Sequence, residues 1–396
     1  MFRFLTAGES HGPGLTAIIE GIPAGLPLSA EDIDPHLRRR QGGYGRGGRM
    51  KIEQDRAIIR SGVRHGLTLG SPITLEINNK DWENWQVKMS PTPVEEPIEP
   101  VTLPRPGHAD FAGAIKYGHQ DIRNVIERSS ARETAARVAV GAVCLTLLRQ
   151  FGAAVHSHVL SIGPVGYRAD EQSAIKRAFS EDYWAQVEES LVRCGDSGLA
   201  EQMIQHIQQS KPKGETCGGV VEVVATGIPI GLGSYSQWDR RLSTRLAAAL
   251  MSIPSVKGVE IGGGFATTAL PGSEVHDVLE WNDALGWQHL TNNAGGIEGG
   301  ISNGAPIIAR AAVKPISTLA HPLPTVNIQT RENVSEGRYE RSDVCVVPAA
   351  GVVAEAMMAI VLAEAWLEKF GGDSLAELRA HVHASQRNES PGQVMG

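Results

Sequence analysis

The stretch between Asp34 and Glu53 carries six cationic side chains and no acidic one. Five glycines within it allow the backbone to fold closely around a ligand, and guanidinium groups match phosphate and carboxylate with paired hydrogen bonds. The composition therefore favours a cradle for an anion. A solvated basic loop or an RNA contact is the alternative, because runs of charge commonly lie on the surface. The cations are Arg38, Arg39, Arg40, Arg46, Arg49 and Lys51.

Two histidines lie in short segments that combine glycine with polar residues. His11 belongs to residues 8–12, Gly-Glu-Ser-His-Gly, and His108 belongs to residues 105–110, Arg-Pro-Gly-His-Ala-Asp. Histidine is the side chain best suited to moving protons near neutral pH, so both are candidates for acid or base catalysis. Either one alone fits a loop histidine that bonds to a backbone group, and only their combination favours chemistry.

A third basic group coincides with the predicted start of a helix. Ser130 and Glu133 have the spacing of a capping box, in which the serine accepts a hydrogen bond from a first-turn amide and the glutamate reaches back. We expect a helix from there to about Gln150, covered on most sides because its alanines and valines surround it. Arg128 and Arg132 flank its start, where free amides and the helix dipole favour an anion. The alternative is an ordinary helix cap with exposed arginines.

Two segments nearer the C-terminus add cationic and hydroxyl groups. Residues 314–318, Lys-Pro-Ile-Ser-Thr, lie on a turn stiffened by proline, and residues 341–343, Arg-Ser-Asp, precede an apolar helix; both could bind a phosphate or the edge of a flavin. Residues 43–48 are superficially similar to a dinucleotide fingerprint, but no strand precedes them, so we exclude a Rossmann site. The histidine pairs at 156 and 158 and at 381 and 383 lack a third ligand, and we expect no metal.

Composition and charge exclude several classes of protein. The net charge of -7 over 396 residues argues against a general binder of nucleic acid, which normally carries a basic surplus. The four cysteines are scattered without paired spacing, which favours a reducing compartment over a disulfide framework or a zinc site. Residues 1–7 leave no room for a signal peptide, and the apolar stretch 346–367 contains Glu355 and Glu364. We therefore expect a cytoplasmic protein without a membrane segment.

Strand and helix patterns follow one another irregularly. Six prolines between residues 80 and 107 exclude a ladder or a continuous helix there, so we expect a long surface loop. The order lacks the βαβ period of a doubly wound sheet and predicts one α+β domain over residues 1–396, with a solvated tail over 382–396. The predicted strands are 14–22, two within 56–78, 218–226 and 256–261, and the predicted helices are 130–150, those within 170–210, 239–251, and 348 to the glycines at 371 and 372.

Together these segments resemble the chorismate synthase family. The resemblance covers nearly the whole chain, because five separated motifs occur in the order of the family between residues 8 and 343. Any one motif could arise by chance, whereas the set is highly specific. The motifs are residues 8–12 followed by 20–23, residues 38–46, residues 105–110, residues 127–134 and residues 341–343.

The resemblance implies a fold in which antiparallel β-sheets sandwich core helices, and a homotetramer. It implies the 1,4-anti elimination of phosphate from 5-enolpyruvylshikimate 3-phosphate (EPSP), with reduced FMN, to give chorismate for the synthesis of aromatic amino acids. Such an enzyme is a carbon-oxygen lyase without its own reductase domain. An external flavin reductase or another reductant supplies the reduced FMN, so that NADPH acts only indirectly.

The resemblance also assigns binding residues. Arg49, Arg105 and Arg132 match substrate-binding arginines. Arg40 and Arg46 match positions assigned in the family to a nicotinamide nucleotide, but the phosphate and two carboxylates of EPSP account for them better, because these groups are costly to bury unpaired. Many bacterial relatives have Asn-Ala at positions 254 and 255, an exchange that only a backbone contact would survive. The matching FMN positions are Arg128, Ser129, Ser130, Pro254, Ser255, Gly299, Lys314, Pro315, Ile316, Ser317, Thr318 and Arg341.

Three residues receive chemical roles by hypothesis. We assign His11 to protonate or hydrogen bond the departing phosphate, His108 to protonate the flavin near N1 or stabilise its anion, and Asp343 to relay the proton that flavin N5 takes from C6 of the ring. Two other classes stay open. An ordinary flavin oxidoreductase would consume reduced nicotinamide in proportion to product. An RNA-binding protein using residues 38–51 would show an affinity that falls steeply with salt, although the acidic charge argues against it.

Overall fold

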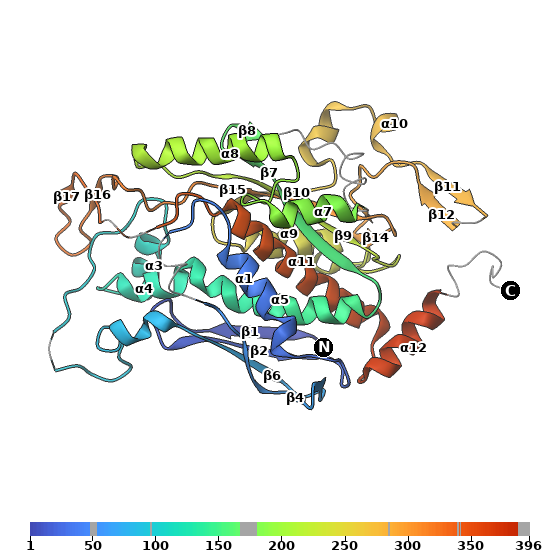
Figure 1. Ribbon diagram of the computed structural model, residues 1–396, viewed down its shortest axis with the longest axis horizontal. Helices are drawn as coiled ribbons and strands as arrows, with labels where there is room; N and C mark the ends of the chain where they lie inside the picture. The colour runs from blue at the N-terminus through green and yellow to red at the C-terminus, as the bar shows by residue number, and fades with distance from the viewer. Residues whose placement is uncertain are drawn as a thin grey trace.

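The computed structural model describes residues 1–47, 54–95, 97–166, 180–283, 286–338, 340 and 342–386. Two antiparallel sheets lie on either side of a layer of long helices (Figure 1). This arrangement confirms the predicted α+β sandwich, in which the helices lie between the sheets.

The first sheet has the strand order β1-β2-β6-β3, and all its neighbours are antiparallel. In β2, Leu15, Ala17 and Ile19 are buried while Ile18 between them is exposed, as expected for a strand with one face on the core. The strands predicted at 14–22 and within 56–78 are confirmed, and the residues between the latter two form a small hairpin. The strands are β1 Arg3–Ala7, β2 Gly14–Glu20, β3 Ile58–Ser61, β4 Val63–Arg64, β5 Leu67–Thr68 and β6 Ile73–Asn78.

The second sheet has the order β10-β15-β9-β7-β8, again antiparallel. Strand β9 is almost entirely apolar because both of its faces are covered: Val223 belongs to the main core, whereas Val224 packs with Trp184 of helix α7. The strands predicted at 218–226 and 256–261 are confirmed. The strands are β7 Ala154–Ile162, β8 Val165–Gly166, β9 Gly219–Thr226, β10 Val256–Ile261 and β15 Ile307–Val313.

Helices α1 (Asp34–Gln41), α5 (Thr134–Arg149) and α11 (Val347–Phe370) form the layer between the sheets (Figure 1). Helices α5 and α11 approach so closely that a Cβ at Gly141 would lie 2.4 Å from the Cβ of Ala356. By length and composition alone α11 could cross a membrane, but 89% of its most apolar window is buried inside the protein. It is the core helix that we predicted, with a proline in its first turn and a glycine at its end.

Shorter elements surround this sandwich. Helices α3 and α4 lie beside the start of α5, next to the proline-rich segment (Figure 1), in which the described residues after η2 form neither helix nor strand up to residue 107. The remaining elements are η1 Ala30–Asp32, η2 Lys80–Asn84, α3 Asp110–Tyr117, α4 Arg123–Ser129, η3 Ala131–Glu133, α7 Glu181–Glu189, α8 Ser197–Ser210, η4 Lys211–Lys213, η5 Trp238–Arg240, α9 Leu242–Met251, η6 Gly264–Ala269, α10 Gly272–Val275, β11 Leu279–Asn282, β12 Gly286–His289, β13 Ile297–Glu298, β14 Ile301–Ser302, β16 Thr325–Val326, β17 Asn333–Val334 and α12 Leu375–Gln386.

The predicted capping box is only half formed. The hydroxyl of Ser130 accepts from the backbone amide of Arg132 at 3.3 Å, as expected. Glu133 instead pairs with Arg137 one turn further along, at 2.9 Å. A charge-assisted bond to a guanidinium is stronger than a bond to a backbone amide, so the glutamate turns forward along the helix.

The solvated tail, predicted over residues 382–396, was placed too early in the chain. Helix α12 continues to Gln386, because Leu375, Leu378 and Val382 are buried against the core. This buried apolar face, which the polar composition of the C-terminus did not indicate, extends the helix beyond residue 382. Residues 387–396 lie outside the described part of the chain.

Candidate functional site

The predicted anion-binding residues lie at the end of the helical layer where α1 ends and α5 and α11 begin. Arg40, near the end of α1, donates to the hydroxyl of Thr134, the first residue of α5, over 3.4 Å. The carbonyl of Gly45 accepts from the amide of Val344, just before α11, over 2.8 Å. The basic segment therefore meets the beginning of two long helices, whose dipoles favour negative charge.

Asp55 lies between two buried arginines at this end. Its carboxylate accepts from Nη2 of Arg40 at 2.9 Å and from Nη1 of Arg132 at 2.6 and 2.7 Å. Burial raises the pKa of Asp55, but the charges of Arg132 and Arg40 outweigh burial and bring the pKa below its ordinary value. One carboxylate thus faces two guanidinium groups, and one positive charge is left for a ligand.

Two guanidinium nitrogens of this cluster are buried without a hydrogen-bond partner among the described residues. They are Nε of Arg40 and Nη2 of Arg132. A buried donor without an acceptor costs about 1–3 kcal/mol, so an anionic ligand that accepts from these nitrogens would be strongly favoured. Burial lowers the pKa of Arg40 to about 10, with Asp55 opposing and Arg132 adding to the shift, so that Arg40 is a cation at neutral pH.

Asn79, directly after β6, connects Arg132 to the segment that carries His11. Its side-chain oxygen accepts from Nε of Arg132 at 2.9 Å. Its amide nitrogen donates to the carbonyls of Glu9 and Gly12 at 3.1 and 2.8 Å, which fixes the turn around the histidine. Two sites predicted separately are therefore positioned by one buried side chain.

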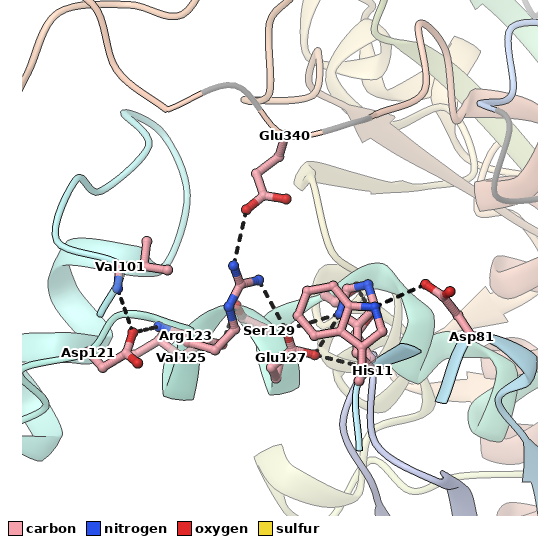
Figure 2. Close-up of polar contacts among 12 residues, drawn as sticks. His11, Asp81, Val101, Asp121, Arg123, Val125, Glu127, Ser129 and Glu340 are labelled. Carbon is pink, nitrogen blue, oxygen red and sulfur yellow. Dashed lines mark hydrogen bonds and ion pairs between the residues drawn. The ribbon is translucent and has the colours of Figure 1, made fainter. Parts of the chain in front are cut away.

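His11 is held at one edge by Glu127 of α4 (Figure 2). Its Nδ1 lies 2.9 and 3.0 Å from the two carboxylate oxygens, and its backbone amide donates to the same carboxylate over 2.8 Å. Burial raises the pKa of Glu127, but the hydrogen bonds and charge of His11 outweigh burial and lower it below the ordinary value. No residue in the described ranges hydrogen bonds Nε2 of His11, which is the ring atom available to a ligand.

Arg105, His108 and Asp110 form a second cluster at the start of α3. The buried carboxylate of Asp110 accepts from Nε of Arg105 at 2.8 Å and lies 2.5 Å from Nδ1 of His108. Burial raises the pKa of Asp110, but the hydrogen bonds from His108 and Arg105 outweigh it and hold the pKa well below its usual range. Arg105 also donates to the hydroxyl of Thr318 at 3.1 Å, which brings residues 105–110 and 314–318 together.

We expect Asp110→Asn to lower both stability and turnover. Asparagine keeps the shape but removes the charge that holds Arg105 and His108, so the free energy of unfolding should fall by roughly 1.5–3 kcal/mol, the range for hydrogen bonds to charged groups. Urea denaturation at pH 7 measures the change. Asp121→Asn is the control, because the side chain of Asp121 accepts, among the described residues, only from the backbone amides of Val101 and Arg123. Equal losses in the two variants would contradict the role of charge.

Lys314 adds a cation to this cluster, and no carboxylate in the described ranges pairs with it. Its ammonium group donates to the carbonyl of Gly107 at 3.1 Å. Burial, followed by the like charge of Lys257, lowers the pKa of Lys314. Two lysines that pair with no carboxylate of the described chain, beside the hydroxyl-bearing turn at 317 and 318, have the donor chemistry that binds phosphate. The Lys314 amide also donates to the carbonyl of Ser255 at 2.8 Å, so the predicted residues Pro254 and Ser255 adjoin this turn.

Asp343 pairs with Arg46 at 2.9 Å and accepts from the amide of Gly47 at 2.5 Å. The charge of Arg46 contributes to the lowered pKa of Arg40, so this pair lies within electrostatic reach of the first cluster. Arg49 and Arg341, which we predicted as binding residues, lie outside the described part of the chain.

The three predicted FMN residues around the end of α4 make bonds within the protein. Arg128 donates to backbone carbonyls of β1 and of the loop after it, at 2.9 and 3.1 Å. Ser129 donates to a carbonyl of its own helix at 2.7 Å, and the hydroxyl of Ser130 accepts from Ser10 at 3.0 Å. These bonds fix the segment that precedes His11 against α4.

Gly299 is not brought together with residues 314–318 in the single chain. It forms the turn between β13 and β14, and the neighbouring Gly300 accepts from the amide of Leu242 at the start of α9. Pro254 and Ser255 follow the other end of α9, a helix of 10 residues. At about 1.5 Å per residue this helix separates the two places by roughly 15 Å.

Three other features of the structure were considered as sites: a cavity, possible metal ligands and the cysteines. A cavity of about 590 Å³ lies at the opposite end of α11, lined by residues such as Phe2, Ile22 and Leu367, and none of the predicted site residues borders it. Within the described ranges, no three His, Cys, Asp or Glu side chains gather as they would around a metal ion. The four cysteines form no disulfide and are all buried: Cys144, Cys194, Cys217 and Cys345.

Comparison with known proteins decides the family. The sequence profile described as chorismate synthase matches residues 2–367. The chain belongs to the chorismate synthase family. It is 54% identical to the chorismate synthase of Moorella thermoacetica, over 97% of this chain and 98% of the relative, and 55% identical to that of Aquifex aeolicus, over 95% of each. This chain also superposes on a crystal structure of a chorismate synthase with a TM-score of 0.80. The superposition covers 98% of each chain, and the two sequences are 44% identical.

The chorismate synthase motifs identified cations and histidines but not the groups that hold them. Glu127 and Asp110 stand inside the motifs at 127–134 and 105–110, so their pairing with the histidines had a signal in the sequence. Asp55 had a weaker signal, as an acidic residue just after the acid-free stretch. Nothing in the sequence indicated Asn79 or Lys257, since an asparagine after a strand and a lysine within a strand are both common.

Proposed function

We propose that this chain catalyses the 1,4-anti elimination of phosphate from EPSP to give chorismate, with reduced FMN as its cofactor. The observation that carries the proposal is the pair of buried guanidinium nitrogens of Arg40 and Arg132 that no described residue hydrogen bonds, found in a chain of the chorismate synthase family. A substrate with one phosphate and two carboxylates supplies acceptors for such donors. Arg46, which lies within electrostatic reach of Arg40, and Arg105 and Arg49 by resemblance, then share the remaining negative charge.

His11 serves the departing phosphate. Because Glu127 holds Nδ1, the imidazole presents Nε2 as the atom that donates a hydrogen bond or a proton to the leaving oxygen. The carboxylate of Glu127 also fixes the position of the ring through both Nδ1 and the backbone amide of His11. Proton donation neutralises charge that would otherwise build up on the phosphate as its bond to C3 breaks.

The second cluster suits the cofactor. Lys314, Lys257 and the hydroxyls after residue 316 fit the phosphate of FMN by their donor chemistry. Reduced FMN supplies, when bound, the electron density that helps the allylic C3-oxygen bond to break. His108, fixed through Nδ1 by Asp110, holds a proton for the flavin near N1, and Asp343 accepts a proton on the path from C6.

The test is anaerobic incubation of the purified chain with EPSP and dithionite-reduced FMN. We expect chorismate and phosphate in equal amounts from catalytic FMN, without consumption of reduced nicotinamide. A flavin oxidoreductase would instead consume reduced nicotinamide in proportion to product. Tight RNA binding that weakens steeply with salt, together with no release of phosphate, would favour the RNA-binding alternative.

The proposal also concerns the oligomeric state of the protein and the source of its reduced FMN. We propose a cytoplasmic homotetramer that receives reduced FMN from an external flavin reductase. A second chain would place Gly299 against a neighbour's flavin, which accounts for its separation from residues 314–318. Light scattering during gel filtration should give about four times the chain mass of 42.3 kDa. A monomer active in the assay would contradict the shared site.

A further inference from the structure

Trp85 lies against the imidazole of His11. The two ring centroids are 3.9 Å apart and the ring planes differ by 23°, which is a stacked arrangement. Trp85 comes directly after η2, in the segment predicted only as a surface loop. Its indole nitrogen donates to Asp81 of η2 over 3.2 Å, a contact that ties the ring to that turn (Figure 2).

The indole is also fixed from other directions. The guanidinium carbon of Arg123 lies 5.2 Å from the ring, and the ammonium group of Lys88 lies 5.3 Å from it. Cations over an indole face contribute about 0.5–2 kcal/mol each, depending on solvent exposure. Arg123 is itself held by Glu127 at 3.2 Å and by Glu340 at 3.6 Å (Figure 2). Elements distant in the chain thus set the position of one aromatic ring.

Glu127 alone does not fix the orientation of His11. A hydrogen bond at Nδ1 leaves the imidazole free to swing about the axis that joins this nitrogen to the carboxylate. A ring stacked on the imidazole face removes that freedom, because a swing would break the contact. The edge contact and the face contact together determine where Nε2 points.

We propose that Trp85 is a positioning residue for His11, holding the imidazole plane so that Nε2 meets the departing phosphate of EPSP. The proposal rests on the function proposed above. It adds the proline-rich segment to the machinery of the reaction through one side chain. A purely structural role, in which Trp85 only anchors residues 80–107 to the body, predicts a different set of results.

The first test separates turnover from binding. Trp85→Leu should lower kcat about tenfold, because small misplacements of a reacting group are costly, while KM for EPSP changes less than about threefold. Trp85→Phe retains an aromatic face and should recover at least half of the wild-type kcat. Trp82→Leu is the matched control, since Trp82 lies in the same turn and its ring contacts no aromatic ring in the described ranges. Wild-type kcat in Trp85→Leu, or equal loss in Trp85→Phe and Trp85→Leu, would overturn the proposal.

The second test does not depend on activity. An imidazole in contact with an indole quenches its fluorescence, so His11→Gln should increase tryptophan emission in the otherwise unchanged protein. The same substitution should leave emission unchanged in a Trp85→Phe background. An equal increase in both backgrounds shows that the two rings do not stack, and the proposal then fails. A third outcome is also decisive. If emission increases only when Trp85 is present but His11→Gln turns over EPSP at the wild-type rate, the rings touch and yet His11 has no role in the reaction. The positioning role of Trp85 then fails as well.

Discussion

Replacing Asp55 with alanine should lower the free energy of unfolding by about 3–5 kcal/mol, the usual cost of removing one partner from a buried ion pair. Asp55 is the carboxylate that bonds both Arg40 and Arg132, and all three side chains are almost completely buried. Without it, two guanidinium groups lie side by side in a medium that solvates them poorly. Urea denaturation at fixed protein concentration and pH 7 measures the loss.

Two comparisons show that this loss comes from unbalanced charge. The double variant Asp55→Ala with Arg132→Met should be more stable than Asp55→Ala alone, because one of the two uncompensated cations is gone. Inorganic phosphate should raise the urea midpoint of Asp55→Ala more than that of the wild type, since an added anion replaces the missing carboxylate. An Asp55→Ala protein as stable as the wild type would contradict the structure of this cluster.

The pH dependence of this stabilisation follows from the direction of the pKa shift. The pKa of Asp55 is lower in the folded protein than its ordinary value of 3.8, so the stabilisation is present above that value and is lost as the pH falls below it. The difference between wild type and Asp55→Ala should therefore stay constant between about pH 5.5 and 8, well above the unfolded pKa of an aspartate.

Local patterns predicted the elements whose burial is simple. Residues 14–22 were predicted as a strand from β-branched and apolar residues between glycines, and the helix after residue 348 from its proline start, its apolar length and the glycines at its end. Strand β7 was missed, because its two histidines at 156 and 158 and the serine between them suggest a polar segment. In the fold His158 is fully buried and bonds to Glu222 on the adjacent strand at 2.8 Å, a pairing between residues 64 positions apart that no local pattern reveals.

In the site too, local patterns predicted some residues, whereas contacts between distant segments defined the others. Residue types and spacing indicated the cations and histidines, because arginines among glycines and histidines in loops have few other uses in combination. Their partners come from distant segments and carry no pattern of their own. Asn79 is an example, since its side chain bonds to Arg132, Glu9 and Gly12, which are distant in the sequence and meet it only in the fold. The separation of Gly299 from Lys314 is another feature that only the fold defines.

Replacing His11 with alanine should reduce kcat by about 10²–10⁴-fold, the range that a positioned acid or base contributes. The substitution removes Nε2, the one ring nitrogen without a partner among the described residues, while the arginines that bind substrate anions remain in place. KM for EPSP should therefore change little, and the loss should appear in single-turnover experiments under anaerobic conditions with reduced FMN.

Glu127→Gln is the matched variant. It retains a side-chain acceptor for Nδ1 but removes the charge, and a smaller loss of roughly tenfold is expected. If His11→Ala turns over EPSP at the wild-type rate, the departing phosphate takes its proton from another group, and the pairing of His11 with Glu127 is structural.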